Sequence, residues 1–362
     1  MTAHAPPSRR TVLTAGLPAA AAVAGVTALT APRPARLGAP TGDAELTRAL
    51  APRLDGHRTV AVALREADWS VRFAGFGADE RREFEIGSVS KTFTGGLLAE
   101  AVARGEVTVE STVAELLGAE ADGSDIADVT LAELATHTSG LPRLAPGMLL
   151  AGWLGTLRRT DPYAGTDAAE VIDAALALSP DGRGEQSYSN LGVALLGQLL
   201  ARTAGTDYAA LLSERILTPL GLEGTYAPIT AGGLRRDAPH GHTSTGLGSA
   251  PWTLNGSAPA GGIRSTAEDM AAYLAAVADG TAPGAAAATE VLHEASGERT
   301  AMTWFLEETG GTPLTWHNGM TGGFAAFAGF VPDSGRGLVI LTDTARSVDE
   351  VARDVLSGEV AA

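Results

Sequence analysis

The stretch Phe84-Glu-Ile-Gly-Ser-Val-Ser-Lys-Thr-Phe-Thr-Gly95 places a serine, Ser88, three residues before a lysine, Lys91. Residues three apart on a helix are surface neighbours, so a helix that begins here puts both side chains on one face. Gly87 permits a tight turn just before the serine. The free N–H groups of a helix N-terminus favour negative charge at Ser88, and Lys91 can accept the serine proton if burial lowers its pKa. Ser-x-x-Lys alone also occurs by chance on solvated helices.

The segment Tyr188-Ser189-Asn190 is the first candidate partner of this serine. It lies between a polar loop and an apolar run, 191–204, that is typical of a buried helix. A tyrosine beside a lysine can act as a general base, because a cation lowers the pKa of the phenol. An asparagine offers a donor and an acceptor to a substrate amide. Taken alone, the segment is more typical of a helix start, with Ser189 or Asn190 as the N-cap.

The second candidate partner is Trp316-His317-Asn318-Gly319-Met320-Thr321-Gly322-Gly323. Glycines at the end of a strand let a substrate approach the backbone closely. A strand edge there can donate an N–H to an oxyanion and hold the substrate alongside as an extra strand. The alternative is a glycine-rich connection between two strands, with His317 half buried.

Composition limits the classes of function. The 362 residues carry a net charge of −16 and no cysteine. The acidic balance argues against nucleic acid and anionic membrane surfaces as partners. The lack of cysteine excludes disulfides, thiolate metal sites and cysteine nucleophiles. His240-Gly241-His242 has no closely spaced carboxylate on a helix, so we expect no metal and no cofactor.

Residues 1–40 do not have the pattern of a folded segment. Arg9 and Arg10 precede an alanine-rich apolar run that ends near Ala31, and this arrangement resembles a twin-arginine export signal followed by a linker over 32–40. The alternatives are an uncleaved membrane anchor, as in a tethered accessory protein, and a disordered basic tail. We expect a protein that is secreted or held in the cell wall or periplasm, with no stable membrane insertion after signal cleavage.

The remaining residues, 41–362, predict strands at both ends of the chain and helices in the middle. Period-2 patterns and turn signals predict strands over 59–64, 70–76, 300–306, 314–317, 324–331 and 337–342. Apolar periodicity predicts helices over 43–54, 92–104, 167–178, 191–204, 208–217, 266–278 and 348–356. Ser265 and Glu268 predict a capping box for the helix over 266–278.

The simplest architecture joins the two chain ends in one antiparallel sheet flanked by the terminal helices. This is an α+β fold in one domain, 41–362. We expect a sheet lobe over about 43–104 and 295–362, and a mostly helical lobe over about 105–294.

Three motifs in this order resemble the penicillin-recognising serine hydrolases, which include class C-type β-lactamases, serine DD-peptidases and related esterases. They are Ser-x-x-Lys at 88–91, Tyr-x-Asn at 188–190 and His-x-Gly at 317–319. Thr136-His-Thr-Ser-Gly-Leu-Pro142 and Gly261-Gly-Ile-Arg-Ser-Thr-Ala-Glu-Asp-Met270 also look like this family. The resemblance runs from about 43 to 357 and implies a β-lactamase/transpeptidase-like fold.

The resemblance also implies roles. Ser88 would form an acyl-enzyme, Lys91 and Tyr188 would share the general-base work, and Asn190 would orient Lys91 and the substrate amide. The backbone N–H groups of Ser88 and of Met320 would form the oxyanion hole.

His317, two residues before Gly319, stands where β-lactamases usually carry lysine. A histidine is only partly charged near neutral pH, so it would hold a substrate carboxylate less firmly. Arg143 and Arg264 are further candidates for carboxylate binding. We expect His137 to pack a turn under the site, and Trp252 either to line the acyl pocket or to be a core or surface residue.

These implications favour an exported serine hydrolase that acts on an ester or a D-amino-acid amide, of the DD-carboxypeptidase or esterase type. The expected partner is a small molecule or peptide, such as a peptidoglycan-like peptide. Tyr-x-Asn in place of Ser-x-Asn argues against a class A-type β-lactamase. The alternatives are a class C-like β-lactamase that hydrolyses β-lactam antibiotics and, from another class, a non-catalytic cell-wall-binding or regulatory module of the same fold.

Overall fold

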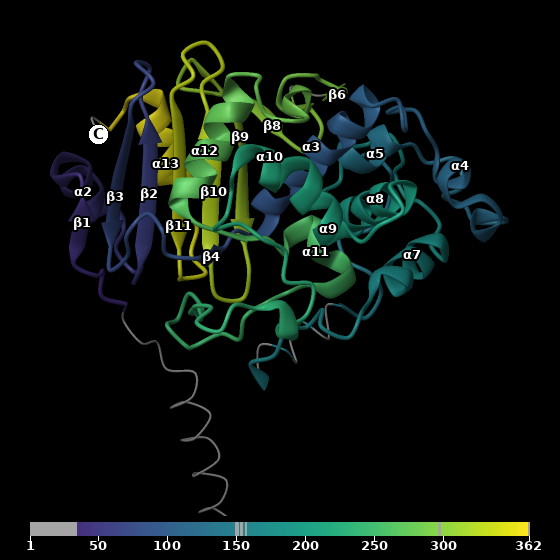
Figure 1. The fold of residues 1–362 in the computed structure, drawn as a ribbon, viewed down its shortest axis with the longest axis horizontal. Coiled ribbons are helices and arrows are strands. Elements are labelled where there is room, and N and C mark those ends of the chain that lie inside the picture. The colour runs from purple at the N-terminus through teal and green to yellow at the C-terminus, as the bar shows by residue number, and fades with distance from the viewer. Residues whose placement is uncertain (1–34, 149–151, 153–154, 156–157, 296–297, 361–362) are drawn as a thin grey trace, which may run out of the picture.

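A single antiparallel sheet draws on both ends of the chain. The computed structural model describes residues 35–148, 152, 155, 158–295 and 298–360. Within these residues nine strands pair in the order β1-β3-β2-β11-β10-β9-β8-β7-β6, so the first strands lie beside the last ones, as Figure 1 shows. The strands are β1 (Pro40–Gly42), β2 (Val60–Arg65), β3 (Val71–Phe76), β6 (His293–Ala295), β7 (Glu298–Thr300), β8 (Phe305–Thr309), β9 (Thr312–Met320), β10 (Ala325–Phe330) and β11 (Gly337–Thr342).

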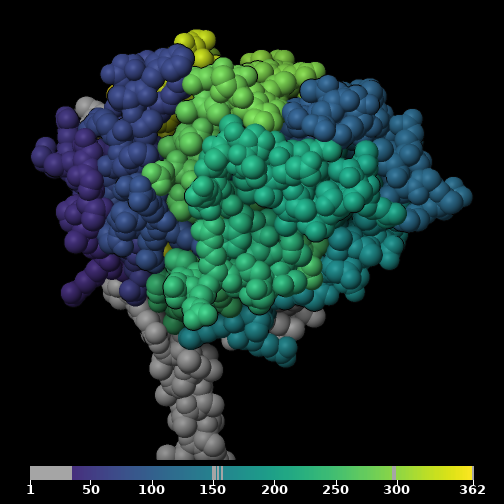
Figure 2. Space-filling view, viewed as in Figure 1, coloured from purple at the N-terminus to yellow at the C-terminus, as the bar shows by residue number. Residues whose placement is uncertain are grey.

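Side chains that alternate along the strands give the sheet two apolar faces. On β2, Val60, Val62 and Leu64 belong to a cluster with α2 (Ala44–Leu50) and α13 (Asp349–Ser357), whereas the alanines between them belong to the cluster that contains α12 (Ala267–Ala278). Neighbouring residues of a strand point to opposite faces, which explains this division. Figure 2 shows the middle of the chain covering the α12 face.

Helices fill the space beside the sheet. α3 (Ser90–Ala103) and α8 (Asn190–Thr203) are buried over most of their length and form the centre of this part. The others in the described residues are α4 (Val113–Leu117), α5 (Leu131–Ala135), α7 (Ala168–Leu176), α9 (Tyr208–Leu212), α10 (Thr218–Leu220) and α11 (Ala258–Gly261). The predicted α+β fold, with one antiparallel sheet from the two chain ends, is confirmed. The proposed lobe boundaries remain a prediction, and α12, inside the predicted helical lobe, packs on the sheet.

Two local predictions are wrong. The strand expected over 300–306 is interrupted, because β7 ends at Thr300 and β8 begins at Phe305. Thr303 has a φ of 72°, and the Ala301 N–H donates to the Trp304 carbonyl oxygen at 3.0 Å. A tight turn therefore occupies the middle of a segment whose composition favours a strand.

The capping box predicted for α12 is also wrong, by one residue. Thr266 is the N-cap, and its hydroxyl accepts the N–H of Asp269 at 3.1 Å. The Ser265 hydroxyl is instead 2.7 Å from that of Thr225. Both registers contain a hydroxyl three residues before an acid, so the pattern alone did not distinguish them.

The expected export signal lies outside the described residues, as do residues 32–34 of the linker. At the end of the expected linker, β1 begins at Pro40 and pairs with β3. A search of the described residues finds no helix with the length and hydropathy of a membrane span.

Arg264 is fully buried between two acids and is therefore no substrate ligand, contrary to the expectation. Its guanidinium forms ion pairs with Glu83 and, at 2.8 Å, with Glu85. These pairs join β4 (Phe84–Glu85) to β5 (Arg264–Ser265), just before the Ser88 turn. Burial raises the pKa of Glu85 to about 7, and the Arg264 charge offsets only part of this effect.

The raised pKa predicts a pH-dependent stability. Because the folded state favours the protonated carboxyl, this contribution is fully present below the ordinary glutamate pKa of 4.5 and is lost as the pH rises toward about 7. We expect the free energy of unfolding of Glu85→Gln to exceed that of the wild type at pH 8 by up to about 3 kcal/mol, and the difference to shrink near pH 5. Denaturant titrations at both pH values measure it. The exposed Glu110→Gln is the matched control; parallel pH curves for wild type and Glu85→Gln would contradict the prediction.

Candidate active site

The Ser88 turn lies against the end of strand β9. Gly87–Val89 form a single 3-10 turn, and α3 starts at Ser90, so Ser88 precedes the α-helix. Gly87 has a φ of +52°, and a Cβ there would lie 2.6 Å from the Met320 nitrogen. The predicted tight turn is confirmed, and glycine is required both for the positive φ and for the close approach of the two segments.

The Lys91 side chain joins three segments of the chain. Its Nζ atom lies 3.0 Å from Ser88 Oγ, 2.8 Å from Asn190 Oδ1 and 2.5 Å from the carbonyl oxygen of Ala260. The side chain is fully buried. The structure therefore brings the serine, the lysine and the asparagine into contact, although Asn190 is 99 residues from Lys91 in sequence.

Burial determines the charge of this lysine. It lowers the pKa of Lys91 well below the usual value of 10.5, and the Arg143 charge lowers that pKa further. A neutral amine has two protons and one lone pair. An uncharged Lys91 that donates to Asn190 Oδ1 and to the Ala260 carbonyl, two atoms that only accept, would leave its lone pair for the Ser88 hydroxyl.

Tyr188 has the opposite pKa shift to the expected one. Burial raises the pKa of its phenol to about 12, although a hydrogen bond with Ser88 opposes the change. The expectation of a lowered pKa assumed that Lys91, whose Nζ lies 5.0 Å from the ring centre, carries a full charge, and burial disfavours that charge. In the resting site Tyr188 therefore keeps its proton, whereas burial disfavours the protonated form of Lys91.

The helix-start interpretation of Tyr188-Ser189-Asn190 is confirmed, and the functional interpretation remains a prediction that the geometry allows. The Ser189 hydroxyl caps α8 by accepting the Gly192 N–H at 2.9 Å. The residues on either side of the cap point their side chains to Ser88 and Lys91. The helix start thus fixes the two functional groups.

A second loop supports that segment. The Ser189 hydroxyl donates to the Pro142 carbonyl at 2.8 Å, and the Asn190 N–H donates to the Arg143 carbonyl at 3.0 Å. The His137 ring packs 4.5 Å from the Tyr188 ring, and its Nδ1 accepts the Ser189 N–H at 3.2 Å. This placement agrees with the structural role expected for His137.

The end of β9 has one free edge. β8 pairs with β9 only from Thr312 to Trp316, so the edge beyond Trp316 is not covered by β8. The Thr321 N–H donates to the Phe324 carbonyl, toward β10. Because successive N–H groups of a strand point in opposite directions, the Met320 N–H points to the free edge.

The oxyanion-hole prediction requires that edge to face Ser88. A Cβ on Gly319 would lie 2.9 Å from the Ser88 nitrogen and 1.9 Å from the Ile86 carbonyl oxygen. The backbone nitrogens of Ser88 and Met320 thus flank the same small space. Their role as paired donors remains a prediction.

His317 is placed beside the site, but the expected partial charge is wrong. The side chain is fully buried, and burial lowers its pKa to about 3. Its Nδ1 lies 2.6 Å from the Asn318 carbonyl oxygen, so the proton of the neutral ring is on Nδ1. His317 is therefore uncharged near neutral pH, and whether it contacts the substrate remains a prediction.

Arg143 is the cation nearest to the catalytic candidates. Its guanidinium lies 5.0 Å from the centre of the Tyr188 ring, and the residue is exposed. Within the described ranges no acidic side chain forms an ion pair with it. Among the two arginines considered from sequence, only this one is free to meet a substrate.

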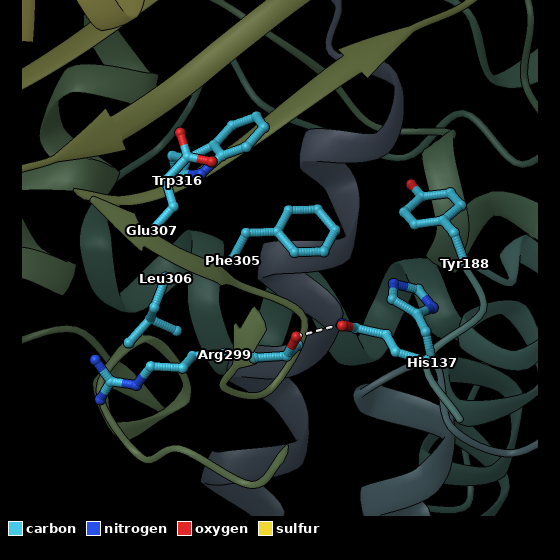
Figure 3. A pocket seen from close by; sticks show the side chains of 9 residues that line it. His137, Tyr188, Arg299, Phe305, Leu306, Glu307 and Trp316 are labelled. Carbon is cyan, nitrogen blue, oxygen red and sulfur yellow. Dashed lines mark hydrogen bonds between the residues drawn. The ribbon is translucent and has the colours of Figure 1, made fainter. Parts of the chain in front are cut away.

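A cavity adjoins Tyr188 on the side of β8 (Figure 3). Its volume is about 520 Å³. Figure 3 shows Phe305 between Trp316 and Tyr188, with His137 next to Tyr188. The lining residues are His137, Gln186, Tyr188, Arg299, Thr300, Phe305, Leu306, Glu307 and Trp316. Sequence reasoning did not single out Gln186 or the β8 residues, since only the β8–β9 pairing brings Phe305 near Tyr188.

Trp252 and His242, two further residues considered from the sequence, do not line this cavity. Trp252 packs against Tyr163, with ring centres 5.7 Å apart, and lies against Gly322 of the β9–β10 turn. The His242 N–H donates to the carbonyls of Gly323 and Asp343. In the described part of the chain, no three histidine, aspartate or glutamate side chains gather in a group that could hold a metal ion.

Comparisons with known proteins identify the family of this chain. A sequence model of the beta-lactamase family matches residues 46–362. Penicillin-binding protein 4 of Amycolatopsis lactamdurans is 30% identical over 290 residues, which are 72% of each chain. A class C beta-lactamase superposes with a TM-score of 0.73 at 20% identity, covering 86% of this chain and 93% of the other.

A D-stereospecific amidohydrolase from Streptomyces sp. superposes with a TM-score of 0.72 at 20% identity, covering 86% of this chain and 97% of the other. At these identities the structural similarity establishes the fold alone. The family match covers nearly the whole described chain, and it includes all three motifs. The chain therefore belongs to the beta-lactamase family of serine hydrolases.

Proposed function

We propose that this chain hydrolyses an ester or an amide through an acyl-enzyme on Ser88. One observation carries the proposal: the Lys91 amine is fully buried and 3.0 Å from Ser88 Oγ, and burial lowers its pKa well below the usual value of 10.5. A serine hydroxyl is a weak nucleophile until a base removes its proton. A buried neutral amine within hydrogen-bond distance is such a base, and the raised pKa of Tyr188 excludes a resting phenolate.

In acylation, the Ser88 proton moves to Lys91 Nζ while Oγ bonds to the substrate carbonyl carbon. The negative oxygen that forms is held by the N–H groups of Ser88 and Met320. The tetrahedral intermediate collapses, the bond to the leaving atom breaks, and the Tyr188 phenol gives that atom its proton. The Lys91 ammonium returns a proton to Tyr188, so both groups end as they began.

In deacylation, the same groups act on water. Tyr188 and Lys91 together take a proton from the attacking water, and the new C–O bond forms as the bond to Ser88 Oγ breaks. The proton returns to Ser88 and the carboxylic acid product leaves. Asn190 Oδ1 accepts from Lys91 throughout and so keeps the amine aligned with Ser88.

The neutrality of His317 favours substrates without a carboxylate at that position. β-Lactams and D-Ala-D-Ala peptides both carry one, whereas esters and simple D-amino-acid amides do not. The name of the Streptomyces neighbour, a D-stereospecific amidohydrolase, supports an amide substrate. The family name and the class C neighbour support the second candidate, hydrolysis of β-lactams.

A non-catalytic module of the same fold is less favoured. Such a module has no need for an amine that is buried without a counter-ion, which destabilises the charged form. The contacts of Lys91 with Ser88 and Asn190 are those that catalysis needs.

We also propose that the chain is exported through the twin-arginine route, on the basis of Arg9, Arg10 and the apolar run that follows. Sequencing the N-terminus of secreted protein is the test. A start near residue 32 supports signal cleavage, and an intact Met1 in the mature material contradicts it.

The nucleophile is tested by covalent labelling. We expect a fluorophosphonate to add once, on Ser88, and the adduct to be absent in Ser88→Ala. Mass spectrometry of the intact protein and of its peptides measures this. Ser90→Ala is the matched control, because its hydroxyl is two residues away and accepts the Ile263 N–H at 3.0 Å. A wild type that remains unlabelled would contradict the mechanism.

The role of Lys91 as a base is tested by replacing it with a residue that cannot lose its proton. Lys91→Arg keeps the positive charge and removes the neutral form, since arginine stays protonated at all working pH values. We expect kcat/KM for a p-nitrophenyl ester to fall by about 10³-fold or more. Rates within tenfold of the wild type would assign the base to another group.

The pH profile tests the Arg143 charge. Because this charge lowers the pKa of Lys91 and of Tyr188, its removal raises both. We expect the acid limb of kcat/KM to move to higher pH in Arg143→Gln and to stay in place in Arg143→Lys, which keeps the charge. An unshifted limb in Arg143→Gln would show that Arg143 does not act on the base.

A further inference from the structure

The Glu85 carboxyl contacts both of the backbone segments that carry the N–H groups of the expected oxyanion hole. Glu85 is on β4, three residues before Ser88, and is 1% exposed. Its Oε1 accepts the N–H of Trp252 at 2.9 Å and a guanidinium N–H of Arg264 at 2.8 Å. These two donors occupy one oxygen of the carboxyl. The other oxygen, Oε2, is also buried and takes part in neither contact.

Thr321 meets this carboxyl from the β9–β10 turn. It follows Met320 directly, is 7% exposed, and forms a side-chain hydrogen bond with Glu85 that lowers the pKa of the carboxyl. The Thr321 hydroxyl oxygen accepts the N–H of Phe324 at 3.2 Å and that of Gly323 at 3.4 Å. A hydroxyl has two lone pairs and one proton. With both lone pairs occupied, its proton is left for Glu85, whose Oε2 has no other partner in the described residues.

Trp252 connects Glu85 to the same turn by a second route. Its N–H is bound by the carboxyl, and its ring lies against the backbone of Gly322, where an added Cβ would be 2.9 Å from two ring carbons. Thr321 and Gly322 are thus both held from Glu85, one directly and one through the Trp252 ring. The turn that follows Met320 is therefore held by one carboxyl at two points.

The two segments are in close contact beside this carboxyl. A Cβ on Gly319 would lie 1.9 Å from the Ile86 carbonyl oxygen, and one on Gly87 would lie 2.6 Å from the Met320 nitrogen. In such tight packing, a small movement of the turn relative to β4 changes the distance between the N–H groups of Ser88 and Met320. A misplacement of about 1 Å in a catalytic site can lower the rate about 10²-fold.

The carboxyl is costly in this place. Burial raises the pKa of Glu85 to about 7, and the Arg264 charge offsets only part of this effect. A neutral side chain of the same shape would avoid the cost and would still accept from Trp252 and Arg264 through its oxygen. Only the contact with Thr321 needs the second carboxylate oxygen, so this contact is the one for which an acid is required.

We infer that Glu85 is a positioning residue of the oxyanion hole, which holds Thr321 and thereby fixes the Met320 N–H relative to the Ser88 N–H. Because Glu85 is buried, it acts through the turn and not on the substrate. The inference rests on the proposed acyl-enzyme and adds to it the group that sets the geometry of its oxyanion hole.

A boronic acid tests the oxyanion hole directly. When phenylboronic acid reacts, the Ser88 oxygen bonds to boron, the serine proton moves to Lys91, and one boron hydroxyl occupies the oxyanion position. We expect Glu85→Gln to weaken phenylboronic acid by about tenfold or more at pH 8, where the wild-type carboxyl is mostly ionised. kcat/KM for a p-nitrophenyl ester should fall by a similar factor. Wild-type values for both quantities would overturn the inference.

Glu85→Gln separates positioning from folding. Glutamine keeps an acceptor oxygen for the other two donors but turns a donor toward the Thr321 proton, so only the contact with Thr321 is lost. The variant is expected to be more stable than the wild type at pH 8, so unfolding cannot explain weaker binding. Asp279→Asn is the matched control, because it removes a carboxylate that Arg65 binds at 2.8 Å, just after α12. An equal loss of boronic acid affinity in Asp279→Asn would contradict the inference.

Variants of Thr321 test whether Glu85 acts through this residue. Thr321→Ser keeps the hydroxyl and should bind phenylboronic acid as the wild type does, whereas Thr321→Val should bind it more weakly. In the Thr321→Val background, Glu85→Gln should have no further effect, since the contact that it breaks is already absent. A full additional loss in the double variant would show that Glu85 acts by another route. If Thr321→Val does not fold, the comparison of Glu85→Gln with the wild type still decides.

Failure of the inference is distinct from failure of the proposed function. Wild type that is labelled on Ser88 by a fluorophosphonate, but binds phenylboronic acid no better than Glu85→Gln, refutes only the positioning role. Wild type that is neither labelled nor bound by phenylboronic acid refutes both.

Discussion

The burial of one amine is the constraint on which the site depends. Lys91 is surrounded by uncharged groups, and an ammonium ion there would lose its hydration without gaining a counter-ion. Burial therefore favours the neutral amine, whose two protons have acceptors on α8 and α11. With both protons committed, the direction of the lone pair follows from geometry, and the neutral state of His137 and His317 follows from the same dry surroundings.

The fold creates these surroundings by bringing distant segments together. α3 provides the lysine, the start of α8 provides Asn190 and Tyr188, α11 provides the Ala260 carbonyl, and β9 provides the backbone at Met320. The close approach of the Ser88 turn to β9 is possible because Gly87 and Gly319 have no side chains. The outer surface is acidic, yet the positive charge nearest to the catalytic side chains is Arg143.

The sequence predicted the contacts of the site better than its electrostatics. Ser88, Lys91 and Asn190 were identified from short motifs. Each motif lies at the start of a helix, where the spacing of a few neighbouring residues determines which side chains lie together. The pKa of Tyr188 and the charge of His317 were misjudged, because burial is a property of the whole fold and no short window of residues reveals it. The Phe305 side of the cavity was missed for the same reason: β8 reaches Tyr188 only through its pairing with β9.

The order of strands in the sheet has a consequence for how the chain acquires its structure. β2 pairs along its whole length with β11, so that Val60 faces Thr342. As the chain leaves the ribosome, β2 and β3 have an unprotected edge until the last strands have been synthesised. Ser88 and Lys91 are made early, but the strand that carries the Met320 N–H comes near the end. A product truncated before β9 therefore contains Ser88 and Lys91 without the Met320 backbone beside them, and its β2 lacks the strand with which it pairs.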